Sequence, residues 1–255
     1  VLNASTAGAV GNDIFIRDTI SNLAIGTVNA GSGNVNLESL IGAITDNDAL
    51  GTNNITAATL TLDADDGIGT VADPLDITVT TLDAANVTLG AIVLTEANGL
   101  TVNNLSNSVV GGLIPLVSNI GSIALKDGSV VSNGGAVSLT ATAGNITDAD
   151  AGATAVNIST SAGSLSLSAK TNIGDITSFA AGTGEALEIN LGAGTLTNAS
   201  IVDAGGEIFL GVTGNLSAGA GAIVVGTGVD ASVIVTATGD VNVSGGIVLD
   251  GNDSL

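Results

Sequence analysis

Apolar and polar residues alternate in short runs along the whole chain, and most runs end at Gly, Asn or Asp. A period of two places the apolar side chains of a run on one face, as in a β-strand with one buried side. The turn-forming residues close each run after a few positions. The pattern therefore predicts short strands rather than helices. Clear examples are Val35-Asn36-Leu37, Leu60-Thr61-Leu62, Val137-Ser138-Leu139, Val156-Asn157-Ile158 and Leu165-Ser166-Leu167.

The runs recur about every 20 residues, a spacing typical of a parallel β-helix. The steps are 19 residues from Val137 to Val156, 22 from Leu165 to Leu187 and 21 from Leu187 to Ile208. We expect an all-β solenoid of about a dozen coils, roughly 50–60 Å long at the spacing of paired strands. Tandem β-sandwiches are the alternative, because they also consist of short strands joined by turns.

No change in composition marks a linker between domains. Residues 1–50 repeat less cleanly than the rest, so we expect atypical coils there and continuous β-helix repeats over residues 51–255. The chain starts at Val1 without an initiator Met or a secretion signal. We therefore expect a processed product or a piece of a longer protein.

The amino-acid composition excludes several kinds of chemistry. The 255 residues include no Cys, His, Met, Trp or Tyr and only three Phe. Disulfides, metal ligation by Cys or His, and a Ser-His-Asp triad are therefore impossible. The shortage of aromatic residues favours a narrow interior of stacked aliphatic side chains over a thick globular core.

The charge balance restricts the partners. The chain has 24 acidic and 3 basic residues, and its formal charge is -21. Three cations cannot neutralise a row of phosphates, and an anionic lipid surface would repel the chain. No apolar stretch reaches the roughly 20 residues that a transmembrane helix needs. We expect no nucleic-acid binding and no membrane insertion, and we expect Arg17, Lys126 and Lys170 to pair locally with acids.

Residues 57–105 contain the series L-T-L-x-A, G-I-G-T, D-P-L-x-I-x-V and L-T-E-A-N-G-L-T-V. This series resembles repeats of large bacterial exoproteins, the filamentous-haemagglutinin-like adhesins that are exported by two-partner secretion. Residues 134–148 (GGAVSLTATAGNITD) look like a further repeat. The resemblance implies a right-handed β-helical shaft, an extracellular location and an adhesive or scaffolding role. The amino-terminal secretion module of that family is absent, which agrees with a fragment of a long repeat region.

Clustered carboxylates beside turns are the candidate functional residues. Spaced Asp side chains before a Gly can wrap a Ca²⁺ ion, which takes about six to eight oxygen ligands. The alternative is that these side chains only cap and close solvated turns. None of the clusters has the full EF-hand spacing with its terminal Glu. The candidate Ca²⁺ ligands are Asp46 and Asp48; Asp63, Asp65 and Asp66; and Asp148 and Asp150.

A catalytic role would need two positioned carboxylates, as in enzymes that cleave polysaccharides. Pairs such as Glu185/Glu188 and Asp63/Asp65 exist, but a chain with 24 acids offers such pairs by chance. Sugar-cleaving grooves usually carry aromatic platforms, and Trp and Tyr are absent. We therefore expect no catalytic residues and no cofactor other than the candidate Ca²⁺.

Asparagine recurs in the motif N-x-S/T, which strand alternation produces without any link to glycosylation. We expect these side chains in turns, where amides of successive coils can bond to each other along the axis. Examples are Asn54, Asn86, Asn157 and Asn215.

The three aromatic residues are expected in the core or at its ends. They are Phe15, Phe179 and Phe209. Phe209 occupies the polar phase of its strand, so an outward position is the alternative for this residue.

Together these features predict a non-enzymatic shaft of an extracellular bacterial surface fibre or matrix. We expect it to associate with itself end to end, or to continue into neighbouring repeats of a longer chain, and to contact host or matrix surface glycans. Two alternatives stay open, a polysaccharide-binding or polysaccharide-cleaving β-helix protein and a Ca²⁺-stabilised matrix protein.

Overall fold

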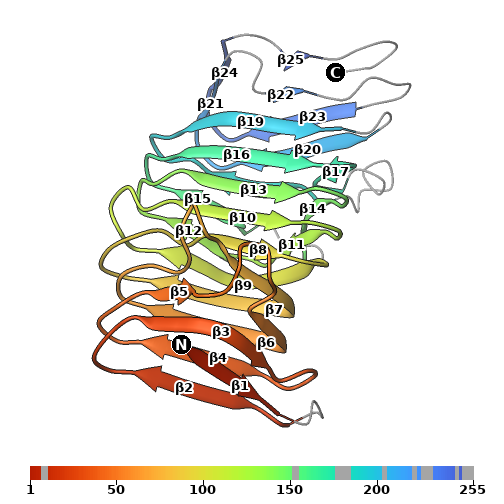
Figure 1. Ribbon diagram of the computed structural model, residues 1–255. Coiled ribbons are helices and arrows are strands. Elements are labelled where there is room, and N and C mark those ends of the chain that lie inside the picture. Colours follow the sequence, from red (N-terminus) through yellow and green to blue (C-terminus); the bar gives the residue numbers. More distant parts are fainter. Residues whose placement is uncertain are drawn as a thin grey trace.

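The computed structural model describes residues 1–6, 11–150, 155–175, 185–202, 206–219, 223–224, 232–244 and 247–248 (Figure 1). In these residues the regular structure is entirely β, and all pairs of strands are parallel. The strands stack about 23 residues apart and form a β-solenoid of about nine turns. The predicted parallel solenoid is confirmed, and the alternative of tandem β-sandwiches is wrong. The described residues contain no helix that is long and apolar enough to cross a membrane.

The strands are short, as the alternation predicts. Those of the first coils are β1 (Leu2–Ser5), β2 (Ile14–Asp18), β3 (Leu23–Asn29), β4 (Val35–Ser39), β5 (Ile44–Asp46), β6 (Ile55–Ala64), β7 (Leu75–Asn86), β8 (Leu94–Glu96) and β9 (Leu100–Asn107). The central ones are β10 (Ile114–Ser118), β11 (Ile123–Leu125), β12 (Val130–Ser132), β13 (Val137–Ala141), β14 (Ile146–Asp148), β15 (Ile158–Thr160), β16 (Ser164–Ala169), β17 (Asn172–Ile173) and β18 (Leu187–Asn190). The last are β19 (Thr195–Ile201), β20 (Glu207–Val212), β21 (Leu216–Ala218), β22 (Ile223–Val224), β23 (Ser232–Ala237), β24 (Val241–Val243) and β25 (Ile247–Val248).

In the centre of the molecule each coil contributes three strands, which belong to three parallel ladders. The first ladder contains β8, β10, β13, β16 and β19. The second contains the start of β9, then β11, β14, β17 and the start of β20. The third contains the end of β9, then β12, β15, β18 and the end of β20. Toward the amino terminus the third ladder continues through β7, β6, β4 and β2.

The core is a column of aliphatic side chains inside these ladders. In the first ladder, Ile114, Val137, Leu165 and Leu196 lie in register in successive coils, and each is at most 1% exposed. Burying one such side chain contributes about 1.5–3 kcal/mol. Because each layer repeats the one below, the core needs no large rings to fill irregular space, in agreement with the predicted aliphatic interior.

The coils are longer and fewer than predicted. Val137 pairs with Leu165, and Leu165 pairs with Leu196. The predicted steps to Val156 and Leu187 instead joined motifs that lie on different ladders. The strands of all three ladders have the same alternating sequence pattern, so the pattern does not distinguish one ladder from another. About nine turns at about 4.8 Å each give an axial length of about 43 Å rather than 50–60 Å.

Glycine lets successive coils approach closely where the chain passes from the third ladder to the first. Gly112, Gly135, Gly163 and Gly194 lie above one another at this corner. A Cβ built on Gly135 would overlap the backbone carbonyl oxygen of Gly112, and one on Gly163 would overlap that of Gly135. The backbones are therefore in direct contact, and larger residues are excluded from this column.

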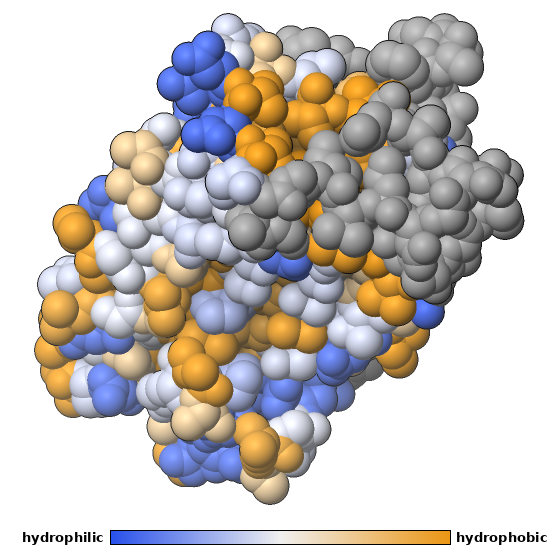
Figure 2. Space-filling view, turned by 90° about the horizontal axis from the view of Figure 1, so that it is seen from above, coloured by the Kyte–Doolittle hydropathy of each residue, from blue (hydrophilic) through white to orange (hydrophobic). Residues whose placement is uncertain are grey.

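Apolar side chains are only partly covered at both ends of the described core. At the first coil these are Leu2, Ala4 and Ile16, and at the last coils Val235 and Val243 are among them. Figure 2 looks onto the end that carries the last coils and shows hydrophobic atoms among hydrophilic ones there. In the interior of the stack the equivalent positions are covered by the next coil.

The two aromatic residues within the described part of the chain differ in their burial. Phe15 lies on the outer side of β2 and is 72% exposed, so its expected place in the core is wrong. Phe209 points away from the main core but is buried against Ala186 and Ile234, which form a small second cluster. Phe179 lies outside the described residues.

Candidate functional site

The first predicted acidic turn follows β5 and is closed by its own backbone. The Asp46 carboxylate accepts a hydrogen bond from the Asp48 backbone N–H at 2.7 Å. Asp48 Oδ2 in turn accepts a long hydrogen bond of 3.5 Å from the Thr27 hydroxyl of the coil below. These contacts are those of a capped turn.

The second acidic turn follows β14 and repeats this arrangement. The Asp148 carboxylate accepts a hydrogen bond from the Asp150 backbone N–H at 2.9 Å, as Asp46 does from Asp48. Asp150 Oδ2 accepts one from the Asp127 backbone N–H of the coil below at 3.0 Å. The sequence Ile-Thr-Asp-x-Asp at residues 44–48 and 146–150 therefore folds in the same way twice.

A fully buried asparagine completes each of these turns. Asn54 donates from Nδ2 to Asp46 Oδ1 at 2.6 Å and to the Gly26 carbonyl oxygen of the coil below at 3.3 Å. Its Oδ1 accepts from the Asp76 backbone N–H of the coil above at 2.8 Å. One side chain thus joins three successive coils. We call this arrangement the amide bridge.

The second amide bridge has equivalent partners. Asn157 Nδ2 donates to Asp148 Oδ1 at 3.1 Å and to the Leu125 carbonyl oxygen at 3.3 Å. Asn157 Oδ1 accepts from the Glu188 backbone N–H at 2.9 Å. These asparagines were predicted to lie in turns and to bond to other amides along the axis, not to a carboxylate and to backbone groups of neighbouring coils. The repeated pattern of Ile-Thr-Asp-x-Asp followed by Asn-Ile was nevertheless visible in the sequence.

Each amide bridge holds two carboxylates close together in partly buried positions. Among the described residues, Asp46 Oδ2 and Asp76 Oδ2 at the first bridge, and Asp148 Oδ2 and Glu188 Oε2 at the second, are buried without a hydrogen-bond partner. Burial, and then the Asp148 carboxylate, raise the pKa of Glu188 to about 7. Burial also raises the pKa of Asp148 and, together with Asp46, that of Asp76. The charged forms of these acids are therefore disfavoured in the folded protein.

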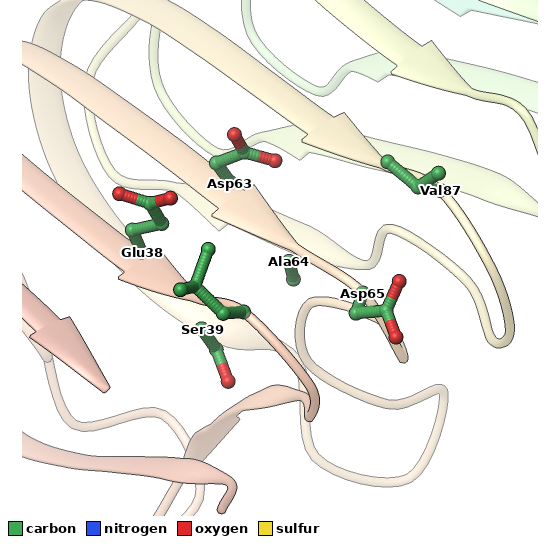
Figure 3. Close-up of a pocket in the computed structure, with 7 residues that line it drawn as sticks. Glu38, Ser39, Asp63, Ala64, Asp65 and Val87 are labelled. Carbon is green, nitrogen blue, oxygen red and sulfur yellow. The ribbon is translucent and has the colours of Figure 1, made fainter. Parts of the chain in front are cut away.

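The third predicted acidic turn has a different geometry. Asp63 faces outward from β6, in register with Glu38 of β4. The Asp65 carboxylate accepts a hydrogen bond from the Thr88 hydroxyl of the next coil. Glu38, Asp63 and Asp65 line one surface hollow of about 210 Å³, drawn in Figure 3. Asp66 is not among the residues that line this hollow.

The hollow carries an excess of negative charge. Arg17 Nε donates to Glu38 Oε2 at 2.6 Å, which confirms the expected local pairing for this cation. Asp63 lies on the other side of Glu38 in the stack, and its pKa is raised by burial and by the Glu38 carboxylate. Leu40 and Val87 form apolar parts of the lining.

The candidate Ca²⁺ ligands lie in these three separate places. Within the part of the chain that the structure describes, no three Asp or Glu side chains are grouped in a way that could hold a metal ion. Asp46 and Asp48 share one turn, Asp148 and Asp150 share another, and Asp63 and Asp65 share the hollow. Calcium binding at these turns stays a prediction.

Glu96 is a buried acid that sequence reasoning missed. It is 0% exposed and lies at the end of β8, between Ile77 and Ser118 in register. Its carboxylate accepts from the Val79 backbone N–H at 3.1 Å and from the Asn98 backbone N–H at 3.0 Å. Burial raises its pKa, although these N–H groups act in the opposite direction. Glu96 thus closes a corner of the coil in place of a backbone turn.

The other asparagines are divided between the interior and the surface. Asn86 Nδ2 donates to Asn107 Oδ1 of the next coil at 3.2 Å, so the expected amide stacking is confirmed for this buried pair. Asn215 is exposed and accepts from the Asp240 backbone N–H. The buried sequons at Asn54, Asn86 and Asn157 are inaccessible in the folded chain.

Comparison with known proteins gave no match. No family model, no curated protein and no solved structure corresponds to this chain.

Proposed function

We propose that this chain is a non-enzymatic structural segment of a shaft in an extracellular bacterial surface fibre or matrix. The observation that supports the proposal is the stacking of parallel strands through about nine turns. Backbone hydrogen bonds between coils point along the axis, so they resist extension in that direction together. The extracellular location is supported by the resemblance of residues 57–105 to adhesin repeats.

The partly covered ends of the core support continuation of the stack. Leu2, Ala4 and Ile16 at one end, and Val235 and Val243 at the other, would be covered by a further coil of the same kind. That coil belongs to a longer chain or to a second copy placed end to end. A strand edge that pairs with another strand also satisfies its exposed N–H and C=O groups.

The shaft proposal is tested by measuring the length of the particle as further copies of the chain are joined to it. One, two and three copies joined in tandem should give particles whose longest dimension in small-angle X-ray scattering grows by about 43 Å per copy. A flexible string of separate beads, with scattering that lacks a rod-like regime, would overturn the proposal. Light scattering of the single copy across concentration tests end-to-end assembly, and a strictly monomeric protein would contradict that part.

Adhesion and catalysis need a separate measurement. Beads that carry the chain are mixed with acidic and neutral polysaccharides, and both retention and the release of reducing ends are measured. A shaft segment leaves the polysaccharides intact. Release of reducing ends would replace the proposed function by the enzymatic alternative.

A further inference from the structure

Exposed aliphatic side chains gather at one corner of the first coils. The turns after β2, β4, β6, β7 and β9 lie above one another, because the Leu40 N–H bonds to the Asp18 carbonyl, the Val87 N–H to the Ala64 carbonyl and the Ser108 N–H to the Asn86 carbonyl. Most of these turns carry large apolar residues that face solvent. They are Ile20, Leu40, Ile41, Val87, Leu89 and Val110, and we call them the apolar ridge.

Neither turn formation nor core packing requires the exposed apolar side chains of the ridge. Ile20 is 81% exposed and Val110 is 85% exposed, so neither contributes to the core. In later coils the same corner is built differently. The turn after β12 contains Asn133 and Gly134, and the turn after β15 contains Ser161. A run of apolar residues confined to neighbouring turns is typical of an interaction surface.

Carboxylates interrupt the ridge at its centre. The turn after β6 carries Asp65 and Asp66 where its neighbours carry Leu40 and Val87. The hollow at this point is lined by Leu40 and Val87 together with three acids. Its volume is about 210 Å³. A long side chain with an apolar stem and a cationic tip matches this lining.

We propose that the apolar ridge docks a basic amphipathic segment of another protein, which places a Lys or Arg side chain in the hollow between Leu40, Val87 and the carboxylates of Asp63 and Asp65. The stem of that side chain packs against the two apolar residues, and its charge meets the two carboxylates. Neighbouring aliphatic residues of the segment cover Ile41 and Leu89. This inference does not depend on the shaft function.

Charge decides between a basic partner and a second copy of this chain. Each copy carries a formal charge of -21 and only three basic residues, so two copies repel each other sideways. Arg17 of the same chain is already paired with Glu38. The Glu38 carboxylate contributes to the raised pKa of Asp63, so a cation supplied from outside would relieve repulsion there.

The probe is a synthetic peptide that alternates Lys and Leu, with a Lys/Ser peptide and a Glu/Leu peptide of the same length as references. Binding to the full chain is measured by fluorescence anisotropy in physiological salt, which screens unspecific attraction. The Lys/Leu peptide should bind at least about tenfold more tightly than either reference, because it alone supplies both kinds of contact.

Two double variants locate the site, and two others serve as controls. Leu40→Ser/Val87→Ser and Asp63→Asn/Asp65→Asn should each weaken binding of the Lys/Leu peptide by about tenfold or more. Leu50→Ser/Val71→Ser removes exposed apolar residues elsewhere, and Asp73→Asn/Asp127→Asn removes acids elsewhere. These controls should change the dissociation constant less than about twofold. Melting curves followed by circular dichroism establish that all four variants fold.

Three results would overturn the proposal. Equal losses in the ridge variants and in the controls would mean that the peptide follows the overall charge. Equal binding of the Lys/Ser peptide would mean that the apolar residues are not used. A lateral dimer of the unmodified chain that Leu40→Ser/Val87→Ser dissolves would assign the ridge to a second copy.

Discussion

The amide bridges provide the sharpest prediction on stability. Replacing Asn157 by Ala removes one side chain that bonds to three coils. The Glu188 N–H loses its hydrogen-bond partner, while the Leu125 carbonyl and Asp148 Oδ1 each lose one of two hydrogen bonds, because a backbone N–H group still donates to each of them. A buried polar group left without a partner costs about 1–3 kcal/mol, and each of the other two lost hydrogen bonds costs about 0.5–1.5 kcal/mol. We therefore expect Asn157→Ala to lower the free energy of unfolding by about 3–5 kcal/mol.

The equivalent change at the first bridge is an internal replicate. Asn54→Ala removes the bonds to the Gly26 carbonyl, Asp46 and the Asp76 N–H, so its cost should fall in the same range. Asn119 is exposed in a turn, and Asn119→Ala should stay within about 0.5 kcal/mol of the unmodified chain. A cost below about 0.5 kcal/mol for either bridge variant would refute the role of the bridge.

The assay follows from the composition. The chain lacks Trp and Tyr, so urea unfolding is followed by far-ultraviolet circular dichroism rather than by intrinsic fluorescence. Solenoids unfold in parts, so amide hydrogen exchange is needed to locate the loss. In Asn157→Ala, exchange should accelerate in β14, β15 and β18 and remain slow in β4 and β6. Uniform acceleration along the chain would contradict the local account.

Three further predictions concern the close approach of coils, pH and cations. Gly135→Ala should lower the free energy of unfolding in urea by more than about 3 kcal/mol, because its Cβ overlaps the Gly112 carbonyl oxygen. The Cβ of Gly219→Ala meets open space, so this control should stay within about 0.5 kcal/mol of the unmodified chain. Equal effects of the two variants would contradict the backbone contact. Stability should fall as the pH rises from 5 to 8. The pKa of Glu188, which is surrounded by Asp148, Glu185 and Asp127, is raised from its ordinary value to about 7. An acid with a raised pKa stabilises the fold most at a pH below its ordinary pKa, and this contribution is lost as the pH rises through the pKa of the folded protein. Glu188→Gln should flatten this dependence, and an unchanged slope would assign it to other acids. Millimolar Mg²⁺ and Ca²⁺ should raise the melting temperature equally if they only relieve repulsion in a chain of charge -21. A larger rise in melting temperature with Ca²⁺ than with Mg²⁺, removed by Asp46→Asn or Asp148→Asn, would establish a specific Ca²⁺ site.

The strands and their inward faces could be predicted from the sequence, because alternation alone decides which side chains face the core. Val35 and Leu37, and likewise Leu165 and Leu167, are buried as expected. Val156-Asn157-Ile158 breaks the rule. Val156 precedes β15, and the polar Asn157 is the residue that turns inward. The inward position of Asn157 is favoured by its hydrogen-bond partners in the coils above and below, which lie far away in the sequence.

Register and the candidate sites could be predicted less well, for a related reason. Asn157 meets Leu125 and Glu188, and these contacts depend on the lengths of the coils between them. Similar strand motifs on three ladders leave those lengths undetermined. The acidic positions themselves were visible as clusters, but whether Asp63 lies beside Glu38 or beside another acid depends on the pairing of β4 with β6.

The segments between the second and third ladders change in length from coil to coil, while the strands on both sides stay in register. They span residues 126–129, 149–157 and 174–186 in three consecutive coils, and β20 then runs through the same corner without a break. The ladders thus tolerate added sequence at this corner. Foreign peptides or small domains grafted between β17 and β18 should be carried on the flank of the solenoid, and a family of such proteins could diversify its surface there without redesigning its interior.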